Sequence, residues 1–527
     1  MKTKTSFIQN QSYFYITLLI IISFSINQYY AFIGVLPVDS FSTFNAGYDI
    51  LNGSYPFKDF WTIKGPVLDI IQAIYFKFFG VSWFSYAAHS SSFNTIFALT
   101  TYFTLKKFGL EVKYCFIYST LASILMYPTY GIPFTDHHVS IFSMLSIYAL
   151  ILAIKTNKNI YWFIIPVLLF LGFFTKQTPA AYFAILIVFI SILYLIKNIR
   201  KEIIFFGLAG VSMSIFCFIS LVFFYKIPFN SILTQYFLFP LSLGETRLEW
   251  LLPFEFQRFV FRHKLIYIAL SIPIFLLVKN IYKNFFNLFE KENLIFLLLV
   301  GSLIIFITHQ LMTINGLFIF FLIPVFAAFS HIYSDKFKNK SLFINFFLIL
   351  SFVSTIYYHQ KYIDKRDTLI LRNLDLNKSV NASVFSEKLK NLKWITHHYP
   401  NSPEKEIENL LNVIQEIKKD NRNKMLVTDY QFISVLLKIN DNSAARIWWR
   451  HHIYPEPEEK HFEDWKNFLL NKIYRDKIDV IYTIHPLEGE KNIFEGLIEN
   501  DCYNSNYINE ILVVQELKEC KELKSFK

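Results

Sequence analysis

The sequence predicts a polytopic α-helical membrane protein with a small soluble α/β domain at its C-terminus. Hydrophobic residues make up 54% of the chain and the mean hydropathy is +0.36, which is too apolar for an ordinary soluble protein. Apolar runs of about 20 residues, long enough to cross a bilayer as helices, recur as far as Tyr358. The composition then becomes that of a soluble domain. We therefore expect a membrane domain over residues 1–358 and a soluble domain over residues 359–527.

The apolar runs predict about eleven membrane-spanning helices. The first run follows Lys2 and Lys4, is too long for the core of a signal peptide and ends without a clean cleavage site, so we expect an uncleaved span. The expected spans lie near residues 13–35, 84–105, 113–128, 138–154, 160–175, 180–196, 203–225, 265–278, 293–309, 315–332 and 341–358.

Charge is divided unevenly and predicts the orientation of these spans. Residues 359–527 hold 26 Lys and Arg against 27 Asp and Glu, so the net charge of +11 comes from the apolar part of the chain. The positive-inside rule places Lys-rich loops such as 106–113 and 197–202 in the cytoplasm. The first long loop and the C-terminal domain are then extracytoplasmic. This basic excess indicates topology signals and contact with membrane lipids, not nucleic-acid binding.

The first outer loop, about 37–83, is expected to form two amphipathic helices that lie in the membrane interface. Apolar residues recur at helical spacing from Phe41 to Leu51, and again between Pro66 and Gly80. Asp39 precedes the first of these helices. It is either an N-cap or an acid that serves chemistry at the membrane surface.

The other outer loops carry further candidates. Asp136, His137 and His138 stand together at the mouth of a span, where they would hold a metal or a phosphate or, alternatively, form an N-cap beside two interfacial histidines. Lys176 lies near the outer end of an apolar span, as a phosphate ligand or a lysine that snorkels to the headgroups. The remaining candidates are Lys64 in the first loop, Arg247 and Arg258 in the fourth, and His309 in the fifth.

The acids and cations on one side of the membrane together indicate chemistry on a lipid with a phosphate-bearing head. A carboxylate can deprotonate an attacking hydroxyl group. Cations can stabilise the negative charge that builds on a departing phosphate.

Three segments carry a resemblance to a known family. The first loop reads "VDSFSTFNAGYDILNGSYPFKDFWTIKGP", with Asp39 after the first span, and two later segments read "LGFFTKQTPAAYFAIL" and "FIFFLIPVFAAFS". These segments resemble the GT-C superfamily of polyprenyl-phosphate-sugar-dependent glycosyltransferases. The resemblance is to the bacterial branch related to protein O-mannosyltransferases and the lipid A aminoarabinose transferase. Those relatives often carry Asp-Glu where this chain has Asp39-Ser40, so protein mannosylation is not implied.

The resemblance implies a GT-C fold and transfer of a sugar, with inversion, from a polyprenyl-phosphate donor to a glycan or lipid acceptor. It implies that Asp39 is the general base and that Asp136 assists it or helps to bind a divalent cation, the candidate cofactor. The implied ligands of the donor phosphate are Lys64, Lys176, Arg247 and Arg258, and the candidates for contact with the acceptor or a metal are His137, His138 and His309.

The C-terminal segment predicts a small α/β domain. Short apolar strands are expected within residues 423–437, 477–486 and 510–520, and an amphipathic helix within 408–420. Cys502 and Cys520 would pair if this domain is extracytoplasmic. The aromatic and cationic stretch at 446–459 would pack on the membrane face or bind sugar.

Two other functions are compatible with a membrane protein of this kind. A polymerase or ligase of lipid-linked oligosaccharides would favour a large late loop with paired arginines. A transporter would place ionisable residues in mid-membrane and show repeated halves. In this chain the most decorated loop is the first, and the predicted spans are nearly free of acids.

Overall fold

The structure is a computed structural model that describes residues 2–127, 130–249, 255–313, 319–363, 371, 374–440, 443–487, 493–494 and 496–520. For residues 2–10 and 245–248 it describes the backbone alone. Its contacts divide the chain into two compact units. The first comprises Met1–Ala31, Ala87–Ile219 and Arg247–Leu369, and the second Phe32–Tyr86, Ser220–Thr246 and Ile370–Lys527. The second unit thus combines the first loop with the C-terminal segment, and a boundary at residue 358 remains a prediction.

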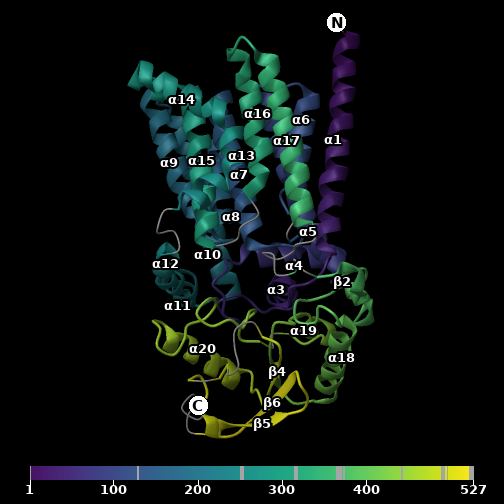
Figure 1. Cartoon of the computed structure of the whole chain (residues 1–527). Coiled ribbons are helices and arrows are strands. Elements are labelled where there is room, and N and C mark those ends of the chain that lie inside the picture. Colours follow the sequence, from purple (N-terminus) through teal and green to yellow (C-terminus); the bar gives the residue numbers. More distant parts are fainter. Residues whose placement is uncertain are drawn as a thin grey trace. The chain divides into compact units, whose positions relative to one another are not determined.

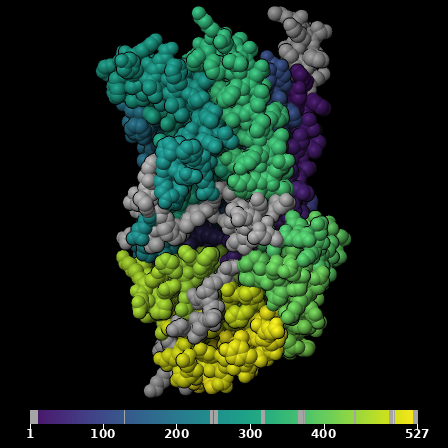
Figure 2. All heavy atoms as spheres, in the orientation of Figure 1, coloured from purple at the N-terminus to yellow at the C-terminus, as the bar shows by residue number. Residues whose placement is uncertain are grey.

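The first unit is built from long helices that lie side by side (Figure 1). In the space-filling view, α13–α15 (teal) and α16–α17 (green) pack against one another (Figure 2). The helices that build this unit are α1 (Lys2–Ala31), α5 (Trp83–Lys107), α6 (Val112–Ile124), α7 (Thr135–Thr156), α8 (Asn159–Phe173), α9 (Gln177–Lys197), α10 (Lys201–Tyr225), α13 (Lys264–Ala269), α14 (Ser271–Lys283), α15 (Lys291–Thr313), α16 (Leu322–Tyr333) and α17 (Lys340–Tyr362).

Several of these helices identify the protein as membrane-embedded. Among the described residues, 6 helices are long and apolar enough to cross a membrane: Gln11–Ala31, Thr135–Thr156, Gln177–Lys197, Lys201–Tyr225, Lys291–Thr313 and Lys340–Tyr362. A helix pairs its backbone N–H and C=O groups internally, and this is required in a membrane because lipid chains offer no hydrogen-bond partners. Large apolar side chains on α10 point outward, with Phe216 67% and Phe223 83% exposed, as expected for a helix that faces lipid.

Helices occupy all of the expected spans in the described part of the chain, with two differences. The span expected at 265–278 is divided at Leu270 into α13 and α14. The span expected at 315–332 begins at residues outside the description and continues as the short 3-10 helix Ile319–Phe321 and α16. The full set of eleven spans remains a prediction.

The first loop forms the two expected helices, after a short α2 (Pro37–Ser40). They are α3 (Ser42–Leu51) and α4 (Val67–Phe79), and Gly80 ends α4 with a positive φ of 78° that suits glycine. The expected polar face of an interfacial helix is absent from α3, because every residue from Ser42 to Asp49 is buried. Elements of the C-terminal segment cover this helix, including α19 (Phe432–Leu437).

The C-terminal segment has the predicted α/β character. Strands β3 (Lys424–Thr428) and β4 (Val480–Ile484) pair in parallel, and β6 (Leu512–Leu517) pairs antiparallel to both β4 and β5 (Tyr503–Tyr507), which gives the order β3-β4-β6-β5. The connection from β3 to β4 contains α19 and α20 (Phe462–Arg475), as parallel pairing requires a crossover. The smaller elements of this unit are α11 (Phe229–Ile232), the π-helix η1 (Leu233–Leu238), α12 (Phe239–Glu249), α18 (Pro403–Lys419), and the two-residue strands β1 (Val380–Asn381) and β2 (Lys393–Trp394).

One hydrophobic core joins the first loop to the C-terminal segment. Trp61 of the loop packs edge-on against Trp465 of α20, with ring centroids 5.4 Å apart, in a cluster that also contains Trp448. The Trp61 backbone donates to the Ala444 carbonyl oxygen over 2.8 Å, and its indole donates to that of Ile453 over 3.0 Å. The stretch 446–459 therefore contributes to this core, and the expected packing on the membrane face and the expected sugar binding both remain predictions.

Candidate functional site

A buried ion cluster lies in the helical unit. The Asp136 carboxylate accepts from Lys176 Nζ over 2.5 Å and from His309 Nε2 over 3.1 Å, both at Oδ1. The carboxylate and the imidazole are almost fully buried, while the Lys176 side chain is 20% exposed. All three residues were sequence candidates, and the structure brings them together.

Three helix ends position this cluster. Asp136 lies in the first turn of α7, Lys176 is the extended residue immediately before α9, and His309 lies near the end of α15. The alternative N-cap interpretation of Asp136 is wrong, because the N-cap residue is Phe134 and Asp136 lies inside the helix with its carboxylate paired to other helices. Charged groups are costly in apolar surroundings, and the mutual pairing of these side chains offsets that cost.

The two neighbouring histidines are buried in an aromatic setting. His137 stacks on Tyr127 with ring centroids 4.8 Å apart and 14° between the planes. His138 Nδ1 lies 3.1 Å from the Phe134 carbonyl oxygen and 3.2 Å from the Tyr127 hydroxyl. Neither side chain is exposed, and the interfacial placement expected for both histidines remains a prediction.

Asp39 lies in the second unit, on the short helix α2. Its backbone N–H donates to the Leu36 carbonyl oxygen over 3.1 Å, and its side chain is partly exposed. The alternative of an N-cap for the following helix is not realised, because Phe41 occupies that position and no side chain caps the helix. Its role as a general base remains a prediction.

Lys64 belongs to a charged cluster in the second unit. Its Nζ donates to Ser42 Oγ over 3.4 Å. It lines a cavity of about 20 Å³, enough for about one water molecule, together with Asp69 and Arg446. Burial raises the pKa of Asp69 to about 7, although Lys64 and other neighbours act to lower it. The cavity is too small for a sugar or a phosphate group in this conformation.

An ion pair that sequence analysis missed stabilises the same cluster. Arg446 donates to Asp49, and both side chains are almost fully buried. The Arg446 guanidinium also lies 3.9 Å from the centre of the Phe60 ring, in a cation–π contact. The two charged residues are 397 positions apart, so no local pattern could have paired them.

The two remaining arginines were expected to bind the donor phosphate. Arg247 lies in α12, and its side chain is outside the described residues. Arg258 lies in the π-helix Gln257–Phe261 and is partly exposed, with its backbone N–H bonded to the Glu255 carbonyl oxygen over 3.0 Å. The phosphate role of both remains a prediction.

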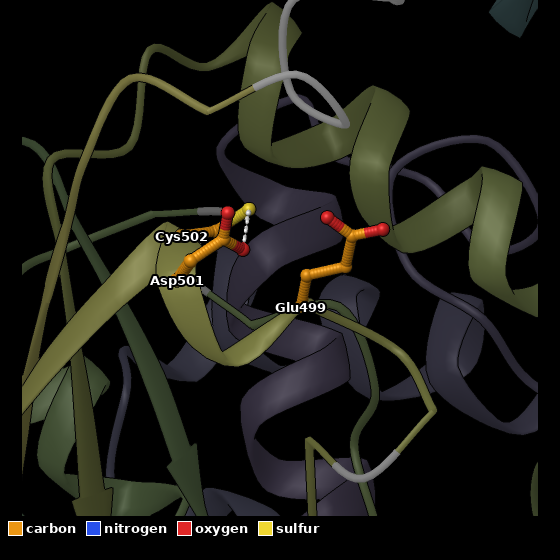
Figure 3. A group of neighbouring side chains, drawn as sticks. All are labelled: Glu499, Asp501 and Cys502. Carbon is orange, nitrogen blue, oxygen red and sulfur yellow. Dashed lines mark hydrogen bonds between the residues drawn. The ribbon is translucent and has the colours of Figure 1, made fainter.

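One acidic group has metal-like spacing. Across the described residues, only Glu499, Asp501 and Cys502 bring three such ligand atoms within 4.8 Å (Figure 3). Cys502 is bonded to Cys520, so its sulfur is not available as a thiolate, and both acids are exposed. Asp136, His137, His138 and His309 do not form such a group in the described structure.

No protein-family model matches the chain, and no curated protein matches its sequence.

Proposed function

We propose that this protein is an integral-membrane glycosyltransferase of the GT-C type. It moves a sugar from a polyprenyl-phosphate donor to a glycan or lipid acceptor at the outer face of the plasma membrane. The observation that carries the proposal is the Asp136–Lys176–His309 cluster: a cation held by a buried carboxylate among apolar helices, with part of the lysine still accessible. Ionisable groups retained in such surroundings mark functional sites more often than structural ones.

Lys176 is proposed to bind the donor phosphate. In the transfer, the bond between the sugar C1 and the phosphate oxygen breaks, and the electron pair leaves with the phosphate. A cation stabilises that charge as it develops. Asp136 and His309 are positioning residues: Asp136 fixes Lys176 and neutralises part of its charge while no ligand is bound, and His309 orients the Asp136 carboxylate.

Asp39 is proposed to accept the proton of the acceptor hydroxyl. The oxygen of the acceptor hydroxyl then attacks C1 of the sugar from the side opposite the leaving phosphate, which inverts the configuration at C1. Asp39 follows the first membrane helix directly and keeps a partly exposed side chain, which suits a base that meets an incoming substrate.

Two features support an extracytoplasmic location for this chemistry. The first loop and the C-terminal segment share a core, so both lie on the same side of the membrane. The C-terminal segment also contains the Cys502–Cys520 disulfide, and disulfides persist in oxidising compartments. Two segments on the same side of the membrane must be separated by an even number of spans. In the proposed arrangement of eleven spans, ten lie between the first loop and the C-terminal segment.

The test compares cells that express the wild type, Asp39→Asn or the matched control Asp375→Asn, an exposed acid of the C-terminal segment. Envelope glycans and lipid-linked sugars are profiled by mass spectrometry. We expect Asp39→Asn to remove one sugar from a glycan or lipid and to accumulate its polyprenyl-phosphate donor, because asparagine keeps the shape but cannot act as a base. Unchanged glycans in a stably inserted Asp39→Asn variant, where the wild type alters them, would refute the assignment.

A further inference from the structure

A second cavity, which none of the candidate residues lines, lies within the second unit. It has a volume of about 570 Å³, within the range of roughly 300–1,000 Å³ that small-molecule sites occupy. One wall is a face of α20, and the other is the segment formed by α11 and η1; Figure 1 labels α20 and α11. We refer to this cavity as the α20 groove.

Polar side chains face each other across the α20 groove. Asn467 and Asn471 are one helical turn apart on α20, and Asn230, Ser231 and Thr234 line the opposite wall. In the described structure none of these five side chains has a hydrogen-bond partner in the protein. Two helices that pack tightly would instead meet through apolar side chains. The groove therefore presents amides and hydroxyls, groups that can both donate and accept.

Two of the cations that line the groove are already paired with carboxylates. Lys472 Nζ lies 3.0 Å from Asp476, and Arg475 pairs with Asp59 over 3.2 Å and with Asp476 over 2.7 Å. Lys58 Nζ lies 3.4 Å from the Tyr225 carbonyl oxygen. A phosphate or another anion would have to compete with Asp476 and Asp59 for Lys472 and Arg475, so the available groups favour a neutral polar ligand.

Both walls are held in place, so the groove is formed before a ligand arrives. The opposite face of α20 contributes Trp465 and Leu469 to the hydrophobic core. On the other wall, the Gln235 amide accepts from the Thr62 backbone N–H over 3.1 Å and donates to the Phe57 carbonyl oxygen over 3.0 Å. Gln235 lies in the π-helix, an irregularity that is common at functional sites.

Aromatic rings complete the surface. Phe468 of α20 lines the cavity while it packs against the hydrophobic core, and Tyr474 at the end of this helix is 44% exposed. A sugar ring presents apolar C–H groups on its faces and hydroxyls around its edge. Rings beside paired amides and hydroxyls match both parts of such a ligand.

We infer that the α20 groove binds a neutral oligosaccharide through Asn467, Asn471 and Thr234. The groove then holds and selects the acceptor glycan; this acceptor role rests on the proposed glycosyltransferase function. Binding itself does not depend on transfer.

The test uses the full-length protein in detergent on an array of printed neutral, amino-substituted and acidic oligosaccharides, followed by titration of the glycan that binds best. We expect Asn467→Ala/Asn471→Ala to weaken binding of that glycan at least tenfold, since two amide hydrogen bonds are lost. Thr234→Val, which keeps the side-chain shape on the other wall, should also weaken it. Asn412→Ala, an exposed position on α18, is the matched control and should bind as the wild type does.

The outcomes separate this inference from the proposed function. If the wild type retains no printed glycan, or if the groove variants bind as tightly as Asn412→Ala, the groove is not a carbohydrate site. If the wild type transfers sugar and the groove variants raise the KM for the acceptor but not for the donor, the acceptor role holds. If glycans bind through the groove but no sugar is ever transferred, the proposed function fails and the binding site stands.

Discussion

The buried Asp49–Arg446 pair offers the sharpest test of the second unit. Replacing Arg446 with Met removes the cation from a carboxylate whose side chain is fully buried. Breaking one partner of a buried pair costs about 3–5 kcal/mol, which for a unit of this size lowers Tm by roughly 6–20 °C. The substitution also removes the cation–π contact with Phe60 and a hydrogen bond to the Ser443 carbonyl oxygen.

The assay is thermal unfolding of the detergent-solubilised full chain, followed by size-exclusion chromatography after heating. Lys405→Met is the control, because that lysine forms an exposed pair with Glu510, worth about 0–1 kcal/mol. The double variant Asp49→Leu/Arg446→Met removes both charges and should recover much of the loss. If Arg446→Met lowers Tm no more than Lys405→Met does, the first loop and the C-terminal segment are not held together as described.

Three further predictions concern the same unit. Because burial raises the pKa of Asp69 to about 7, the folded state binds more protons than the unfolded state between about pH 4 and 7, and stability falls as pH rises through that window. The Tm of the wild type should therefore fall more steeply from pH 5 to 8 than that of Asp69→Asn, and parallel profiles would contradict this. Glu406 accepts hydrogen bonds from Trp394, Thr396 and Tyr430. Glu406→Gln places an NH2 donor against these donors and should lower the free energy of unfolding, measured with denaturant, by about 1–3 kcal/mol. An unchanged unfolding midpoint would argue against this network. Cys502→Ser removes the disulfide with Cys520 and should lower the free energy of unfolding by about 2–4 kcal/mol. Alkylation of intact cells followed by mass spectrometry should label neither cysteine in the wild type. Labelling of both would mean that they are reduced thiols.

The elements of this fold were predictable where local physics decides them. Long apolar runs specified the membrane helices, and Pro66 and Gly80 bracketed α4. Apolar runs also located β3, β4 and β6. Strand β5 was missed because its sequence, YNSNY, is polar and its residues are largely exposed at the sheet edge.

The candidate site was predictable only residue by residue. Asp136, Lys176 and His309 each stood out as charged or titratable groups near span ends, but they are up to 173 positions apart. Nothing local predicts that one carboxylate oxygen accepts from both partners. The packing of the first loop against the C-terminal segment could not be predicted for the same reason. It depends on contacts of Trp61 and Arg446 between stretches that are far apart in the sequence.

The most direct test of the central claim is donor turnover by the purified full-length protein. Undecaprenyl phosphate carrying mannose, glucose or aminoarabinose is supplied with cell-envelope acceptor lipids, and release of free undecaprenyl phosphate is measured by mass spectrometry. We expect the wild type to turn over one donor, and Lys176→Met to lower that rate about 100–1,000-fold, the typical cost of losing one group that stabilises developing charge. Lys197→Met, which removes a lysine from an exposed pair with Glu290, should leave the rate unchanged. Turnover by Lys176→Met at the wild-type rate, or no turnover of any donor by the wild type, would contradict the proposed function.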